Sequence, residues 1–195
     1  MDLAALSVPG AVLEGARFVA TAARDVRIRD DALAGIAGPI DARLAAGIDD
    51  VDVAFGSAGT LARDVNLIMF ETACNFCFWS ERPEDAWQVD VGGTAVGGWY
   101  GLAACFNSAA SGGMPVWDAE WMARLTVGRA HRLFAGIGPP IPLLEQRVNN
   151  IVEVANYLLQ HHHGQALDLL TTVGFSAPEI AATIVRELPS FRDGA

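Results

Sequence analysis

The chain has 195 residues, of which 52% are hydrophobic and 18% are charged. This length and composition predict one folded domain with a buried core, and no apolar run reaches the roughly 18 residues that a membrane-spanning helix needs. The formal net charge is −10 and all 13 basic residues are arginines, so the basic surface typical of proteins that bind duplex DNA or bulk RNA is missing. We expect neither nucleic acid nor a membrane as a partner.

The N-terminus and the cysteines indicate the compartment. Residues 1–6 lack the positive charge and long apolar segment of a secretory signal, so we expect a cytoplasmic protein. Cys74, Cys77 and Cys105 are an odd number of thiols, and disulfides rarely persist in the cytoplasm. Cys74 and Cys77 could form a redox or zinc pair, but no second pair completes a zinc site. We therefore expect free thiols, no metal site and no cofactor.

Hydrophobic spacing predicts a mostly helical chain. Up to residue 78 the expected elements are a helix over 9–23, an extended piece over 25–29, a helix from Asp30 interrupted at Gly38-Pro39, a short helix ending near Gly47, a loop over 49–59, and a helix over 61–78. The alternating residues from Trp87 to Val96 around Gly92-Gly93 predict a single β-hairpin. A helix of small residues over 99–110 should then be central to the fold.

The remaining sequence continues the helical pattern. One or two short helices are expected over 117–134, a proline-rich connector over 136–142, a long helix over 143–161, a helix over 165–172, and a last helix that starts with a capping box at Ser176–Glu179 and ends at Pro189. Residues 161–163 are three consecutive histidines, which diverge on a helix by about 100° each and cannot converge on one metal ion. We expect them at an exposed helix end.

The most unusual stretch is Asn75-Phe-Cys-Phe-Trp79, which precedes a charged turn. Its three rings occupy four positions and cannot share one helix face, because that face recurs every three or four residues. At least one ring should therefore contact something other than the core. The alternative is a buried aromatic cluster in which Asn75 ties down a loop.

Four ordered stretches resemble the queuosine salvage proteins. They are Asn75–Trp79 with Trp87, Gly97–Leu102 leading to Asn107, Ile141–Arg147, and Ser176-Ala through Leu188–Asp193. The resemblance implies a helical fold similar to that of DNA glycosylases, with residues 1–195 as the N-terminal part of the family's domain. It also implies an enzyme that hydrolyses queuosine 5′-monophosphate to free queuine, a base used in tRNA modification.

The chain departs from the family's pattern at two places. Ser108 stands where the family tends to have arginine, and the chain stops at Ala195, before two further family segments. The second of those segments carries the aspartate that is the best candidate for the family's catalytic carboxylate. We therefore expect residues 1–195 to be a fragment that lacks this carboxylate and is inactive alone. The alternative is a helical binding domain without chemistry of its own.

The resemblance implies roles for particular residues. Phe76, Phe78 or Trp79 would stack on the deazapurine base, and Asn75 would read its edge. Arg147 or Arg192 would hold the 5′-phosphate, although an arginine bound to a helix C-terminus or to Asp193 is an equally good interpretation. Four carboxylates, Glu71, Glu81, Glu145 and Glu179, have ready structural roles at helix ends and turns. Asp193 remains as the candidate catalytic group.

Overall fold

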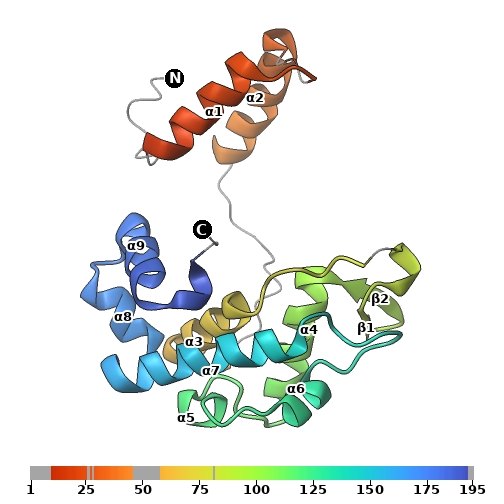
Figure 1. Cartoon of the computed structure of the whole chain (residues 1–195), viewed down its shortest axis with the longest axis vertical. Helices are drawn as coiled ribbons and strands as arrows, with labels where there is room; N and C mark the ends of the chain where they lie inside the picture. The colour runs from red at the N-terminus through yellow and green to blue at the C-terminus, as the bar shows by residue number, and fades with distance from the viewer. Residues whose placement is uncertain (1–9, 26, 28, 46–57, 81, 193–195) are drawn as a thin grey trace. The chain divides into compact units, whose positions relative to one another are not determined.

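The computed structural model describes residues 10–25, 27, 29–45, 58–80 and 82–192. Contacts divide the chain into two compact units, Met1–Val51 and Asp52–Ala195. The first contains α1 (Gly10–Ala22) and α2 (Asp30–Ala45), drawn in red and orange in Figure 1. None of the helices described is both long and apolar enough to cross a membrane.

Helix α2 differs from its prediction. The expected break at Gly38-Pro39 is wrong, because α2 continues through Pro39 to Ala45. A proline inside a helix removes one backbone hydrogen bond, whereas ending the helix there would leave several carbonyl and amide groups without intrahelical partners. The end expected near Gly47 and most of the loop expected over 49–59 lie outside the described residues.

The second unit is helical apart from one hairpin. Its elements are α3 (Leu61–Ala73), η2 (Pro83–Asp85), β1 (Gln88–Val91), β2 (Thr94–Gly97), α4 (Gly98–Ser111), α5 (Ala119–Met122), α6 (Val127–Leu133), α7 (Leu144–His161), α8 (Ala166–Thr172), α9 (Ala177–Glu187) and η3 (Pro189–Phe191). The strands pair antiparallel, with Val91 opposite Thr94 across the Gly92-Gly93 turn. The predicted class, mostly α with a single hairpin, is confirmed.

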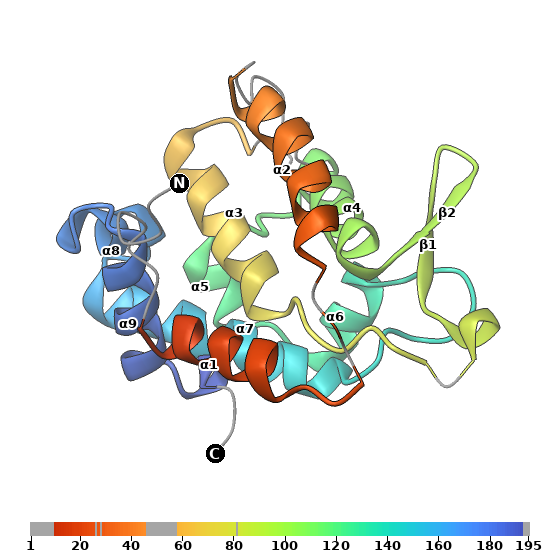
Figure 2. The ribbon, with the colours of Figure 1, turned by 90° about the horizontal axis from the view of Figure 1, so that it is seen from above.

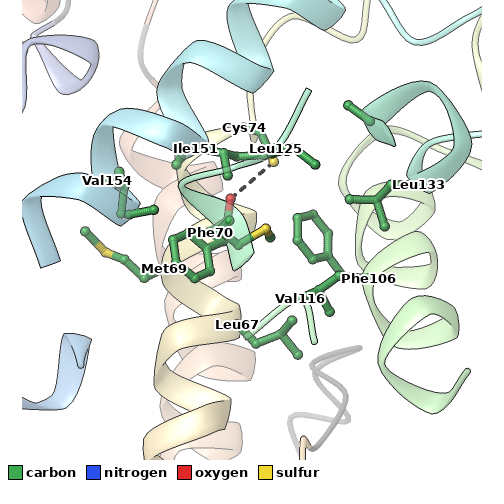
Figure 3. Close-up of a cluster of buried hydrophobic side chains, with 14 of the residues drawn as sticks. Leu67, Met69, Phe70, Cys74, Phe106, Val116, Leu125, Leu133, Ile151 and Val154 are labelled. Carbon is green, nitrogen blue, oxygen red and sulfur yellow. Dashed lines mark hydrogen bonds between the residues drawn. The ribbon is translucent and has the colours of Figure 1, made fainter. Parts of the chain in front are cut away.

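Helix α7 organises the second unit. It packs against α3, α5 and α6, while the hairpin and the α8–α9 pair lie at opposite ends of this unit in both views (Figure 1 and Figure 2). The core is built around fully buried side chains such as Phe70, Phe106 and Ile151, and Figure 3 shows them converging from α3, α4 and α7. Helix α4, which was expected to be central, contributes Leu102, Cys105 and Phe106 to this core and contacts α3, α6 and both strands.

The hairpin is anchored by Trp87, which is 2% exposed and donates its indole N–H to the Phe134 carbonyl over 3.0 Å. A Cβ at Gly136 would lie only 2.2 Å from the Gln88 carbonyl oxygen and 2.9 Å from the Trp87 indole nitrogen. Only glycine allows the connector to approach so closely. The connector that contains Gly136 therefore packs directly against Trp87. Trp87 in turn stacks on Phe78 of the aromatic stretch.

Two local predictions need correction. Ser176 precedes α9, but its side chain makes no capping hydrogen bond, so the capping box is wrong although the helix start is right. His161 and His163 are exposed as expected, whereas His162 is buried and its ring lies 3.3 Å from the Tyr157 hydroxyl. His162 follows the last residue of α7, where the chain turns inward towards α8.

Candidate functional site

Helix α3 ends before the aromatic stretch. The prediction of a helix to Phe78 is wrong, because α3 stops at Ala73 and Cys74 is its C-cap. The cause is tertiary: Asn150 on α7 donates its amide to the Ala73 carbonyl over 3.1 Å, and Arg147 donates to the Cys74 carbonyl. These donors replace the backbone amides that a longer helix would have supplied.

Arg147 holds the stretch that follows. Its side chain is fully buried, and its guanidinium donates to the carbonyls of Cys74, Phe76 and Cys77 and, through Nε, to that of Pro142 over 2.8 Å. Burial lowers the pKa of the Arg147 guanidinium, but arginine stays charged in proteins. One side chain of α7 thus fixes three carbonyls of the loop.

The guanidinium also lies against two rings of the stretch. Its central carbon is 4.5 Å from the centroid of Phe76 and 4.6 Å from that of Phe78, within cation–π range. Phe78 in turn stacks on Trp87, with centroids 6.1 Å apart and ring planes 20° apart. A continuous packed series therefore runs from the hairpin through Phe78 to α7.

Exposure alternates along the aromatic stretch. Phe76 and Phe78 are half-buried against Arg147, whereas Asn75, Cys77 and Trp79 are exposed. Trp79 is 88% exposed, so at least one ring of the stretch lies outside the core, where it is free to contact something else. The alternative interpretation, a buried aromatic cluster, fits only Phe76 and Phe78, which are half-buried. We call residues 75–79 the aromatic loop.

Glu71 is the residue that sequence reasoning assigned incorrectly. Its side chain is 1% exposed, and neither carboxylate oxygen has a hydrogen-bond partner within the described part of the chain. The expected structural role of its carboxylate at the helix end is therefore wrong. A signal was present, since Leu67, Glu71 and Cys74 are spaced four and three residues apart and share a helix face. Leu67 and Cys74 are buried.

The cysteines differ in environment. Cys74 is buried, and its thiol donates to the Phe70 carbonyl over 3.2 Å, the dashed contact in Figure 3. Burial raises the pKa of the Cys74 thiol, and it raises that of Cys105 to about 12. Cys77 is exposed with a left-handed φ of 45°. In the described ranges, no three side chains of histidine, cysteine, aspartate and glutamate gather as metal ligands would.

Of the two remaining candidate residues, the structure describes Arg192. Arg192 donates to the carbonyls of Val185 and Arg186, the latter in the last turn of α9, so it occupies the helix C-terminus as one of the two interpretations expected. Asp193 lies outside the described residues. The structure therefore brings Arg147 into contact with the aromatic loop. The hydrogen bonds of Arg192 are instead to residues of α9.

A separate cavity of about 1020 Å³ lies between the hairpin, α4 and α6. Val89, Val96, Leu133 and Met114 contribute apolar walls to it. Ser108, where the sequence departs from the family pattern, is exposed and lines this cavity. The residue at which the sequence departs from the family pattern therefore lines this cavity, and no residue of the aromatic loop does.

Comparison with known proteins gives one consistent result. A family model described as Queuosine salvage protein matches residues 58–195. Proteins named queuosine 5′-phosphate N-glycosylase/hydrolase are 34% identical over 130 residues in Sphaerobacter thermophilus and 30% identical over 186 residues in Bos taurus. These alignments cover 67% and 92% of this chain, but only 39% and 54% of the relatives.

The matched region contains the aromatic loop, Arg147 and Glu71, so the geometry described above lies within the shared part. The chain spans about half the length of the curated relatives it matches, or less. The family match covers well over half of this chain and coincides with its second unit. The chain belongs to the queuosine salvage protein family.

Proposed function

We propose that the protein hydrolyses the N-glycosidic bond of queuosine 5′-monophosphate and releases queuine, and that the aromatic loop is its base-binding surface. Family membership supports the reaction, because the relatives are named for this hydrolysis. The observation that supports the site is Trp79, an 88% exposed ring on a loop whose carbonyls are fixed by a buried arginine. Because the backbone of this loop is already fixed, little backbone entropy is lost when a base stacks on the ring.

The loop offers two kinds of contact to a base. Stacking on an exposed aromatic ring contributes roughly 1 to 3 kcal/mol per base in single-strand binders, and Trp79 offers such a ring. The exposed amide of Asn75, at the start of the loop, has both a donor and an acceptor for a base edge. Phe76 and Phe78 pack against the Arg147 guanidinium and so stabilise the conformation of the loop.

The 5′-phosphate is assigned to neither candidate arginine. The guanidinium group of Arg147 and that of Arg192 each donate to backbone carbonyls. A phosphate would have to compete with those hydrogen bonds. Arg147 is instead a positioning residue for the aromatic loop. The substrate's phosphate is then bound by other groups of the complete protein.

Cleavage of the bond needs a carboxylate. Positive charge develops on the ribose as the bond breaks, and glycosidases stabilise it with a nearby carboxylate. We propose that Asp193 or a carboxylate outside residues 1–195 has this role, and that residues 1–195 alone bind the nucleotide without cleaving it. A cytoplasmic location, expected from the N-terminus, accords with supply of a base for tRNA modification.

Chromatographic detection of queuine tests this proposal. Two proteins would be compared: residues 1–195, and the full product of the reading frame that encodes them, which we call the full gene product. Each would be incubated with queuosine 5′-monophosphate. We expect release only by the full gene product, with binding by both in calorimetric titration. Comparable turnover by both would overturn the proposal that residues 1–195 alone do not cleave the bond. Binding without release by the full gene product would favour the non-catalytic binding domain.

A further inference from the structure

The substrate of the proposed function carries a 5′-phosphate, and few groups of this chain are suited to bind it. All 13 basic residues are arginines, so within residues 1–195 a permanent positive charge beside the phosphate must come from an arginine. Arg147 and Arg192 donate to backbone carbonyls. The other arginines in the region that the family model matches are therefore the candidates.

Most of these arginines already have a partner. Those in ion pairs with carboxylates, or in contact with an aromatic ring, are Arg63, Arg82, Arg124, Arg129 and Arg186. Arg132, in the last turn of α6, is the exception: no residue that the structure describes accepts a hydrogen bond from its guanidinium or pairs with it. The helix dipole favours a cation in this turn, but it leaves all five N–H donors of the guanidinium available.

Arg132 lines the cavity of about 1020 Å³ between the hairpin, α4 and α6. Clefts that hold small ligands have volumes of roughly 300 to 1,000 Å³, so this cavity is large enough for a nucleotide. It is open to solvent, because Val91, Tyr100 and Ile137 line it and are nevertheless 46%, 62% and 47% exposed. A phosphate can therefore reach Arg132 without any rearrangement of the core.

The guanidinium of Arg132 is not neutralised by the carboxylate that shares its cavity. Asp90 lines the cavity too, but its Oδ1 accepts the Gly93 amide over 2.9 Å, and no ion pair joins the described side chains of Asp90 and Arg132. The exposed hydroxyl of Ser108 also lines the cavity and can donate to a phosphate oxygen. Arg132 is thus available for an anion, and the planar guanidinium suits phosphate because it can donate two parallel hydrogen bonds.

The cavity wall and the aromatic loop contact the same side chain, Trp87. Gly136 lines the cavity, and a Cβ at this residue would lie 2.9 Å from the Trp87 indole nitrogen. Phe78 of the aromatic loop stacks on the Trp87 ring. A 5′-nucleotide has its base and its phosphate at opposite ends, so it needs two contacts that are separate but adjacent. The aromatic loop and the cavity are neighbours of this kind.

We propose that Arg132 binds the 5′-phosphate of the substrate in this cavity while the base stacks on the aromatic loop. This inference rests on the proposed function and deepens it, because it names the group that distinguishes a nucleotide from a nucleoside. Phosphate oxygens accept charge-assisted hydrogen bonds from guanidinium N–H groups. A nucleoside has no phosphate and therefore gains nothing from Arg132.

The preference for nucleotide over nucleoside tests the inference. Calorimetric titration would compare queuosine 5′-monophosphate with queuosine, for the full gene product and for its Arg132→Gln variant. We expect the wild type to bind the nucleotide more tightly than the nucleoside. Arg132→Gln should lose about tenfold in affinity for the nucleotide, as for loss of a hydrogen bond to a charged group, and nothing for the nucleoside. A merely structural role of Arg132 would weaken both ligands alike.

Arg124→Gln is the matched control, because it alters an exposed arginine that pairs with Glu120 and does not line the cavity. It should keep the full preference for the nucleotide, and scanning fluorimetry should give both variants the melting temperature of the wild type, since both arginines are exposed. No preference in the wild type, an unchanged preference in Arg132→Gln, or an equal loss for both ligands would overturn the inference; release of queuine by the wild type would then leave the proposed function intact. Absence of binding and release in the wild type would refute the proposed function and this inference with it.

Discussion

The two buried charged side chains beside Cys74 have opposite environments. Each nitrogen of the Arg147 guanidinium donates to at least one backbone carbonyl, and two rings lie against the group. Glu71 has no partner for either oxygen among the described residues. Charges are expensive to bury without compensation, so the compensated cation indicates a structural role, whereas burial raises the pKa of the uncompensated Glu71 carboxyl and favours its neutral form. Two charged side chains buried close to one another can therefore have opposite effects on the stability of the fold.

The largest effect should come from removing the compensated charge. Arg147→Met would leave four carbonyl groups without their donor, and we expect a loss of at least ~3 kcal/mol in the free energy of unfolding. Arg147→Lys should also destabilise the protein, since a lysine has too few donors in the wrong geometry. Urea denaturation measures both. Arg124→Met, which alters an exposed arginine, is the control, and equal midpoints for it and Arg147→Met would contradict the structural role of Arg147.

Glu71 should make stability depend on pH in the opposite sense to an ordinary carboxylate. Its folded-state pKa of about 7 lies above its ordinary value of 4.5, so the folded protein binds more protons between these values. The free energy of unfolding should therefore fall as pH rises from 4.5 to 7, by up to about 3 kcal/mol from this group, and stay lowered above pH 7. The difference in unfolding free energy between wild type and Glu71→Gln, measured by urea denaturation across this range, isolates the contribution. A difference independent of pH would show that the Glu71 pKa is ordinary.

The effect of removing a ring from the aromatic loop should depend on how deeply that ring is buried. Trp79→Ala should weaken queuosine 5′-monophosphate binding by roughly 1 to 3 kcal/mol and leave the melting temperature almost unchanged, because Trp79 is 88% exposed. Phe76→Ala should lower both affinity and melting temperature, since Phe76 lies on Arg147. Scanning fluorimetry beside calorimetric titration compares them. A large loss of stability in Trp79→Ala would instead favour a packing role for this ring.

The cysteines should show the smallest effect. Replacing Cys74 and Cys77 together by alanine should keep the activity of the full gene product within about tenfold, because Cys74 behaves as a small buried hydrophobic residue and Cys77 is exposed. The double variant should lose some stability, all of it attributable to Cys74. Metal analysis of protein purified without added metal gives an independent check, and stoichiometric zinc would contradict this assignment.

The sequence alone determined those features that depend on local pattern. The hairpin around Gly92-Gly93 was predictable because a tight turn and alternating residues are local properties. The same holds for α7, whose apolar residues recur at helical spacing. The excess of rings in Asn75–Trp79 over one helix face predicted that a ring would lie outside the core, as Trp79 does, but the argument assumed a helix that in fact ends at Ala73.

The tertiary structure decided what happens where distant segments meet. Helix α3 ends at Ala73 because Arg147 and Asn150, more than 70 residues later, bind its last carbonyls, and no local signal encodes such a contact. The same residue, Arg147, was a candidate phosphate ligand in the sequence, and only the tertiary structure shows it donating to carbonyls of the aromatic loop. Glu71 looked like an ordinary helix-end glutamate until packing showed it buried without a partner. Compensation of a buried charge depends on which groups surround it in space, and spacing along the chain does not contain that information.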